Sequence, residues 1–78
     1  MSDYDREAKH KTVLAGLSRL GLQIKMGSNH VVATCPRTQQ KTTLPRHNTV
    51  GKYIVGSICE FLIENGYDEA AIKKAFKW

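Results

Sequence analysis

The segment Leu22–Leu44, LQIKMGSNHVVATCPRTQQKTTL, decides the fold of this chain. Its start alternates apolar with polar residues, the pattern of a strand with one buried face, at Leu22, Ile24 and Met26. A Gly-Ser-Asn turn then leads into the β-branched stretch His30–Cys35. A loop precedes a third short strand, Lys41–Leu44, which Pro45 stops. Three short strands joined by tight turns predict an antiparallel meander.

The residues before this segment predict an amphipathic helix. One buried stripe follows the i, i+1, i+4, i+7 spacing, with apolar residues at Val13, Leu14, Leu17 and Leu20. Ser2 or Asp3 is a suitable N-cap for this helix. Asp5 and Glu7 would then lie near the positive end of its dipole, and Gly21 ends it.

Two further helices are predicted after the strands. Asn48 or Thr49 is a suitable N-cap for the longer helix, which ends at Asn65-Gly66. Its apolar stripe consists of Ile54, Ile58, Phe61 and Leu62. Asp68 caps a short last helix, whose apolar residues are Ile72, Ala75 and Phe76.

The order α-β-β-β-α-α predicts a single α+β domain over residues 1–78. A three-stranded antiparallel sheet with the helices packed on one face would bury every apolar stripe. The other face of the sheet is left to solvent or a partner. A chain of 78 residues buries only about 60% of its unfolded surface, so an active site should lie on the outside.

Targeting and redox features point to the cytoplasm. No stretch approaches the ~18 apolar residues of a membrane span, and the polar, acidic start is unlike a signal peptide. Neither Cys35 nor Cys59 belongs to a C-x-x-C pair, and both are expected to be reduced, partly buried thiols. Zinc binding by Cys35 with His30 and His47 matches no common spacing, so we expect no metal and no other cofactor.

Charge is segregated along the chain. The net charge is +5, and all seven acidic residues lie in the first seven or the last nineteen positions. Residues 8–59 hold eight lysines and arginines and no acid. Such a block predicts a positive face, the electrostatic footprint of a protein that binds a polyanion such as nucleic acid. The alternatives are a solubilising surface or a face complementary to an acidic protein.

Two histidines fall at the ends of the predicted meander. His30 begins the second strand, and an antiparallel third strand returns Arg46 and His47 to the same edge. An imidazole gives and takes protons near neutral pH, so it can help a ribose 2′-hydroxyl attack the adjacent phosphate without a metal. An arginine beside free N–H groups at the start of a helix forms a suitable binding site for that phosphate. The alternatives are a surface histidine at a strand end and a helix-capping loop with incidental basic residues.

The order of these elements resembles the HicA family of small toxins from bacterial and archaeal toxin–antitoxin systems. The resemblance covers residues 12–76. It rests on GSNH before the second strand, CP at its end, TLPRHN after the third strand, and GSICEFLIENGYDEAAIKKAF over the last helices. It implies a double-stranded-RNA-binding-like fold, metal-independent cleavage of mRNA, and inhibition by a partner antitoxin, HicB, that covers the site.

The chain departs from the family pattern at the functional histidine, which directly follows Gly-Ser in the family. Here Asn29 follows Gly27-Ser28, and His30 comes one place later. If the turn holds one inserted residue, His30 is the catalytic histidine. Without an insertion Asn29 replaces it, and the protein binds RNA without cutting it, because asparagine is no general base near neutral pH. Neighbouring strand residues face opposite ways, but the spacing to Pro36 fits the insertion better, so we favour His30.

We therefore expect a cytoplasmic endoribonuclease toxin that acts on mRNA, is monomeric when free and makes no membrane contact. His30 would serve as general acid or base. The residues expected to bind RNA are Lys25, Ser28, Asn29, Lys41, Arg46 and His47. Among them Ser28 and Asn29 would shape the turn, and His47 would orient RNA or supply a second proton-transfer group. The alternative is a non-catalytic RNA-binding module, or a phage or plasmid protein that blocks an acidic host protein.

Overall fold

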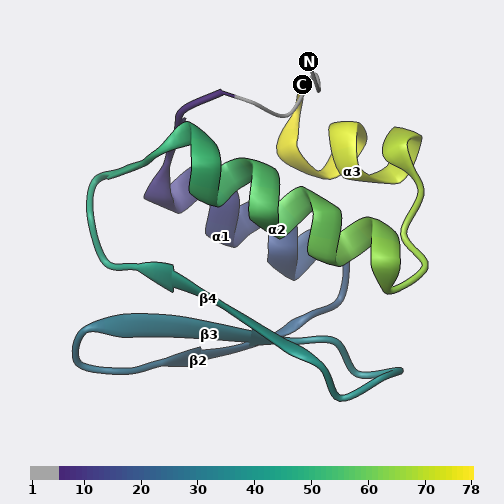
Figure 1. The fold of residues 1–78 in the computed structure, drawn as a ribbon, viewed down its shortest axis with the longest axis horizontal. Coiled ribbons are helices and arrows are strands. Elements are labelled where there is room, and N and C mark those ends of the chain that lie inside the picture. The colour runs from purple at the N-terminus through teal and green to yellow at the C-terminus, as the bar shows by residue number, and fades with distance from the viewer. Residues whose placement is uncertain (1–5) are drawn as a thin grey trace.

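A three-stranded antiparallel sheet lies under the helices in a computed structural model that describes residues 6–78 (Figure 1). The helices are α1 (His10–Arg19), α2 (Lys52–Glu64) and α3 (Glu69–Phe76). The sheet consists, in spatial order, of β2 (Gln23–Met26), β3 (His30–Thr34) and β4 (Lys41–Pro45). A separate ribbon pairs β1 (Ala8–Lys9) with β5 (Thr49–Val50). The predicted meander and the predicted order of helices are thus confirmed, whereas the sequence does not predict the ribbon.

Strand alternation gives the sheet two different faces. Val31 of β3 lies opposite Leu44 of β4, and both side chains are buried beneath the helices. Because neighbouring residues of a strand point to opposite sides, the residues between them form the outer face. Lys25 of β2 and Lys41 of β4 are exposed there, and no helix covers this face in Figure 1. The expectation of one covered and one open face is therefore correct.

α1 and α3 pack against each other at an unusually close point. The aromatic ring of Phe76 lies over Gly16, where an added Cβ would come within 2.1 Å of a ring carbon. Only a residue without a side chain fits at this contact. Asp68 caps α3 as predicted, because its side chain accepts a hydrogen bond from the Ala71 N–H at 2.7 Å. The apolar stripe of α3, with Ile72 as its most buried member, also faces the core as predicted.

The sequence predicts the wrong start for the first helix, and the ribbon explains why. Ala8 pairs with Val50, and Lys9 pairs with Thr49, in antiparallel register. These pairs hold the backbone extended, so α1 begins only at His10. Two residues on each side are too few to leave a recognisable alternation, and their partners are distant in the chain. Tertiary pairing has overridden the helical preference of this segment.

The same ribbon displaces the predicted caps of the first two helices. Thr49 belongs to β5 and Asn48 precedes it, so Gly51 is the N-cap of α2 and makes no side-chain cap hydrogen bond. Glu7 lies before β1 and is therefore absent from the first turn of α1. Three other residues assigned to the start of this helix lie outside the described residues: Ser2, Asp3 and Asp5.

The buried face of α2 is rotated from the predicted one. The residues that enter the core are Val55, Ile58, Cys59 and Leu62. Ile54 was expected in that set but is 36% exposed, and Phe61 is only partly buried. Most positions of this helix are apolar or small, so its sequence leaves the direction of the stripe ambiguous. Contacts with β4 and α3 decide it.

The helices of the described residues are all short. α2, the longest helix, has 13 residues. Within residues 6–78, no helix has the length and apolar character needed to cross a bilayer.

Candidate functional site

The turn after β2 and the loop after β4 are joined at one end of the sheet. The turn closes through a hydrogen bond from the Gly27 N–H to the His30 carbonyl at 2.8 Å. Across the sheet, His30 lies opposite Pro45, which leads directly into Arg46. Arg46 Nη1 then donates to the Gly27 carbonyl at 2.8 Å. The predicted convergence of these two loops is confirmed.

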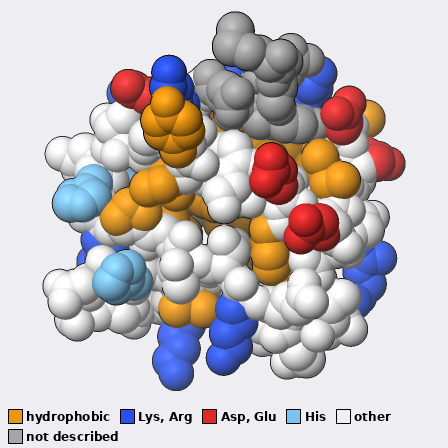
Figure 2. Space-filling view, in the orientation of Figure 1, with side chains coloured by type: hydrophobic (Ala, Val, Ile, Leu, Met, Phe, Trp, Pro, Cys, Tyr) orange, Lys and Arg blue, Asp and Glu red, His pale blue; other side chains and the backbone are white. Residues whose placement is uncertain are grey.

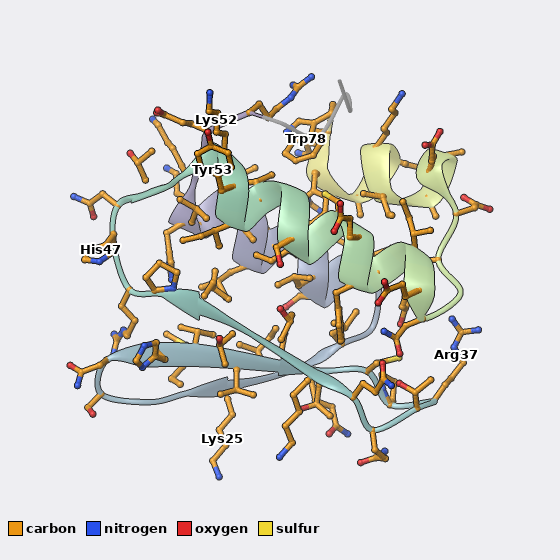
Figure 3. All side chains as sticks on the ribbon, in the orientation of Figure 1. Lys25, Arg37, His47, Lys52, Tyr53 and Trp78 are labelled. Carbon is orange, nitrogen blue, oxygen red and sulfur yellow. The ribbon has the colours of Figure 1, made fainter. Side chains whose placement is uncertain are left out.

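This convergence creates an exposed edge that we call the histidine edge, formed by the turn 27–30 and by Arg46 and His47. His30, Arg46 and His47 are all exposed. Figure 3 shows His47 on the loop beside the sheet, and Figure 2 shows pale-blue histidine side chains on this flank of the molecule. The edge therefore offers imidazole and guanidinium groups to a large ligand.

The two candidates for the catalytic position differ in their backbone setting. His30 is the first residue of β3, and the alternation of the strand places it on the outer face with Val32. Val32 in turn lies opposite Lys25, so His30 and Lys25 share that face. Asn29 belongs to the turn, and its side chain is also exposed. The register thus groups His30, rather than Asn29, with the cations of the sheet.

The outer sheet face carries the two lysines expected to bind phosphate. Lys25 and Lys41 line a shallow hollow of about 370 Å³, with Val32 and Thr43 among its other lining residues. Figure 3 shows Lys25 pointing away from the helices, and Figure 2 shows blue side chains projecting beneath the sheet. Most of the red carboxylate side chains visible in Figure 2 gather over α2 and α3 instead. The lysines beneath the sheet and most of the carboxylates visible in Figure 2 therefore lie on different sides of the molecule.

Sequence reasoning overlooked His10, which lies beside the histidine edge. His10, Arg46 and His47 line the same hollow of about 260 Å³. The His10 N–H donates to the Asn48 carbonyl at 2.9 Å, which ties the start of α1 to the loop after β4. The ring Nε2 is buried and has no hydrogen-bond partner within residues 6–78. No sequence motif marks this histidine, because the pairing of β1 with β5 brings it there.

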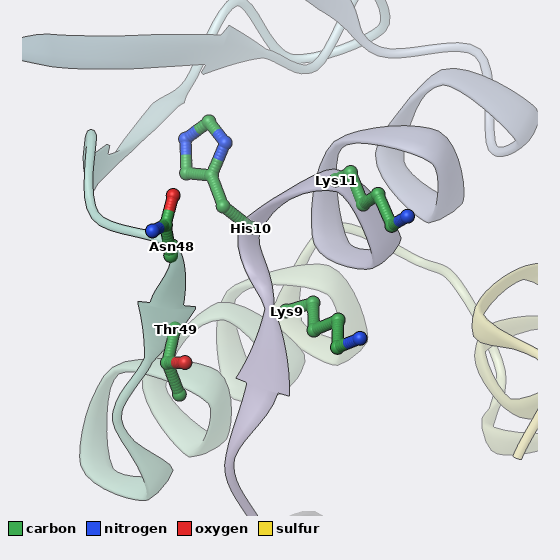
Figure 4. A pocket seen from close by; sticks show the side chains of 5 residues that line it. All are labelled: Lys9, His10, Lys11, Asn48 and Thr49. Carbon is green, nitrogen blue, oxygen red and sulfur yellow. The ribbon is translucent and has the colours of Figure 1, made fainter.

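A further hollow of about 380 Å³ adjoins His10 on the side of the ribbon (Figure 4). Lys9, His10, Lys11, Asn48 and Thr49 line it. The first turn of α1 contains no acidic residue, and neither does the first turn of α2. The positive ends of two helices therefore lie near the ribbon without a carboxylate in their first turns.

A different polar cluster lies at the other end of the sheet. Arg37 Nη2 donates to the Asn65 carbonyl at 3.0 Å, and the Arg37 guanidinium lies 5.0 Å from the centre of the Tyr67 ring. Cys35 Sγ is 3.9 Å from the Tyr67 hydroxyl. This cluster joins the β3–β4 loop to the connection between α2 and α3. Since β3 separates Cys35 from His30, the two cannot share a zinc ion.

The two free thiols, both buried, differ in their environment. Burial alone would raise the pKa of Cys35. Hydrogen bonds from Thr38, from the Arg37 backbone and from Tyr67 outweigh that effect and lower the pKa from 9.0 to about 7. Cys59 lies in the main core, where burial raises its pKa to about 12. Neither thiol belongs to the histidine edge.

Comparison with protein-family models, with curated proteins and with solved structures finds no match to this chain. The chemistry of the histidine edge must therefore be argued from its own residues.

Proposed function

We propose that this protein is a metal-independent endoribonuclease with a double-stranded-RNA-binding-like fold, acting as the toxin of a toxin–antitoxin pair in the cytoplasm. One observation carries the proposal. Arg46 is hydrogen-bonded to the Gly27 carbonyl while His30 lies opposite Pro45, so two imidazoles and a guanidinium are exposed at the same end of the sheet. This combination suits an RNA phosphodiester, which needs proton transfer and charge neutralisation at the same place.

The proposed reaction transfers the phosphodiester within the RNA strand. His30 removes the proton of a ribose 2′-hydroxyl, and the 2′-oxygen attacks the adjacent phosphorus. The new bond joins the 2′-oxygen to phosphorus, and the bond from phosphorus to the 5′-oxygen breaks. His47, in its protonated form, donates a proton to the departing 5′-oxygen. The products are a 2′,3′-cyclic phosphate and a free 5′-hydroxyl, so no metal or added reactant is needed.

The cations of the edge would stabilise the transition state. The attacked phosphate gains negative charge as the 2′-oxygen adds. A guanidinium or ammonium group nearby stabilises this charge and so lowers the free-energy barrier to cleavage. Arg46 is best placed for this role, because it already lies against the turn that leads to His30. Lys25 and Lys41, on the outer face of the sheet, would hold the flanking phosphates.

An mRNA substrate and a HicB-like antitoxin complete the proposal, and both come from the resemblance to the HicA family. An antitoxin that covers the histidine edge should present carboxylates to it, because the cations of that edge would otherwise be buried without partners. The free toxin is proposed to be a monomer.

Asn29 supports one other function. It occupies the position directly after Gly-Ser, where the family carries its histidine. If Asn29 rather than His30 holds that position, the chain is a non-catalytic module. Such a module would bind RNA through the same cations, or would use them to block an acidic host protein.

The test is cleavage of a labelled mRNA in EDTA by the wild type, His30→Ala and Asn29→Ala. We expect cleavage by the wild type and by Asn29→Ala, and none by His30→Ala, because His30, unlike Asn29, removes the proton of the attacking 2′-hydroxyl. Melting temperatures of all three proteins serve as the folding control, and both substituted side chains are exposed. RNA binding without cleavage by the wild type would replace the nuclease with the binding module. Neither binding nor cleavage would point to an acidic protein target.

A further inference from the structure

Three hollows follow one another around the flank of the molecule. The first lies on the outer sheet face between Lys25 and Lys41, and Met26 belongs to both the first and the second. The second contains Arg46 and His47. His10 and Asn48 belong to both the second and the third. Shared lining residues show that the three hollows adjoin one another, and we call this row of hollows the basic groove.

The basic groove is positive along its whole length. Each hollow holds at least two cationic or imidazole side chains, and the third adds Lys9 and Lys11. None of the described carboxylates lines any of the three. A row of cationic and imidazole side chains without a described carboxylate between them matches the regularly spaced charges of a polyanion backbone better than the scattered carboxylates of a protein surface.

The direction of the groove favours a flexible strand over a duplex. Its lining residues begin on the outer face of the sheet with Lys25, continue on the loop that carries His47, and end at the β1–β5 ribbon and the start of α1. Figure 3 shows Lys25 and His47 at well-separated places on the molecule. A stiff A-form helix would contact one face of so small a molecule, whereas a single strand can bend around its edge.

The lining also indicates how such a strand would be held. The described residues that line the groove include no tyrosine, tryptophan or phenylalanine. Tyr53 is 81% exposed but does not line any of the three hollows. Contacts would therefore be made to phosphates and ribose and not by stacking of bases, which predicts little preference for sequence.

We propose that the basic groove binds single-stranded RNA across the histidine edge, with Lys9 and Lys11 holding phosphates that lie beyond the cleaved bond. This inference rests on the proposed function, and it names the substrate of that site as an extended single strand recognised through its backbone. His10 lines both the second and the third hollow, so the accessible part of this residue would contact the bound strand, whereas its ring Nε2 is buried.

The test measures binding to 2′-O-methyl RNA, which lacks the attacking hydroxyl and so separates binding from cleavage. Lys9→Gln/Lys11→Gln is compared with the wild type and with Lys52→Gln/Lys74→Gln. The control pair loses the same charge at two exposed positions that line none of the three hollows. The ligands are single strands of about 4 and about 12 nucleotides and a duplex, because single-strand sites span roughly 4–16 nucleotides.

We expect Lys9→Gln/Lys11→Gln to weaken binding of the longer strand and to leave the shorter one nearly unchanged. Two phosphate contacts account for a salt slope of about 1.4. Raising salt from about 50 to 200 mM should therefore cost the wild type roughly sevenfold more affinity than this variant. The control pair should keep the salt dependence of the wild type.

Equal weakening of single-strand binding by the two double variants would refute the proposal that the basic groove binds RNA. Tighter binding of the duplex than of the single strand by the wild type would refute it as well. In either case His30-dependent cleavage would leave the proposed nuclease standing. Absence of any RNA binding by the wild type would remove both proposals. Binding of an acidic protein in place of RNA would assign this surface to a protein partner and would likewise refute the inference.

Discussion

At the scale of the residue, Arg46 does the most to assemble the candidate site. Its guanidinium spans 19 residues of sequence to reach the Gly27 carbonyl, and it does so from an exposed position. Gly27 itself is constrained, because an added Cβ would lie 2.8 Å from the His30 carbonyl oxygen. The motif-level prediction that these loops meet was possible because antiparallel pairing places them at the same edge. The contact that joins them was not predictable, since it depends on the rotamer of one long side chain.

Two replacements of Arg46 should distinguish the effect of its positive charge on RNA cleavage from the effect of its hydrogen bond to the turn. Arg46→Lys keeps the positive charge but loses the planar fork that reaches the turn, whereas Arg46→Ala loses both. We expect RNA cleavage to fall about tenfold to a hundredfold in Arg46→Ala and to recover only in part in Arg46→Lys, because misplaced catalytic groups are costly. Melting temperatures should barely change, since the side chain is exposed. Full activity of Arg46→Lys would show that charge alone matters.

Cys35 provides a pH dependence whose sign follows from its surroundings. The folded state lowers the pKa of this thiol from 9.0 to about 7, so folding favours the thiolate. Its contribution to stability is complete above pH 9 and is lost as the pH falls through 7. Cys59 affects the pH dependence of stability only above pH 9, where its raised pKa in the folded state favours the unfolded chain. Urea unfolding should give the wild type a higher free energy of unfolding at pH 9 than at pH 7, and this increase should be smaller in Cys35→Ser. An equal increase in the two proteins would refute the stabilising role of the Cys35 thiolate.

At the scale of the element, the sequence predicted a helix boundary correctly where the capping residues lie within a few residues of that boundary. Asp68 caps α3 and Asn65-Gly66 ends α2, as predicted, because a cap bonds to backbone groups a few residues away. The starts of α1 and α2 were missed because the β1–β5 ribbon precedes both. A ribbon of two pairs has no local signature and forms only when the rest of the chain brings its strands together.

The contact between α1 and α3 reverses the usual effect of a glycine in a helix. Gly→Ala in a helix interior normally stabilises by about 1 kcal/mol. At Gly16 the new methyl group would overlap the Phe76 ring, and overpacking typically costs about 1–3 kcal/mol. We expect Gly16→Ala to lower the free energy of unfolding, as measured by urea denaturation. Gly16→Ala/Phe76→Leu should recover part of the loss, whereas a stabilised single variant would mean that the two helices are not in contact.

At the scale of the whole molecule, one core connects the sheet to all three helices. The same cluster contains Leu17 of α1, Val31 of β3, Leu62 of α2 and Ile72 of α3. Loss of any one of these contacts should therefore weaken the entire fold and not a single element. For a domain of this size the total stability is about 4–12 kcal/mol, so one core substitution removes a large part of it.

Two isoleucines test this cooperativity. Ile72 is fully buried, whereas Ile63 is 43% exposed. Ile72→Ala should lower the free energy of unfolding by about 2–5 kcal/mol, and Ile63→Ala by much less. Helical circular dichroism and Trp78 fluorescence should report the same midpoint for each protein, as expected for a single cooperative unit. Separate midpoints for the two signals would show that α3 unfolds independently of the sheet.

The sequence by itself determined the meander, its turns and the placement of His30, Arg46 and His47 at one end of the sheet, because each follows from alternation and from pairing of adjacent strands. Only the tertiary structure decided the ribbon, the later start of α1, the buried face of α2 and the position of His10. All four depend on contacts between segments far apart in the chain, whose free energy exceeds the small local preferences that a sequence pattern records.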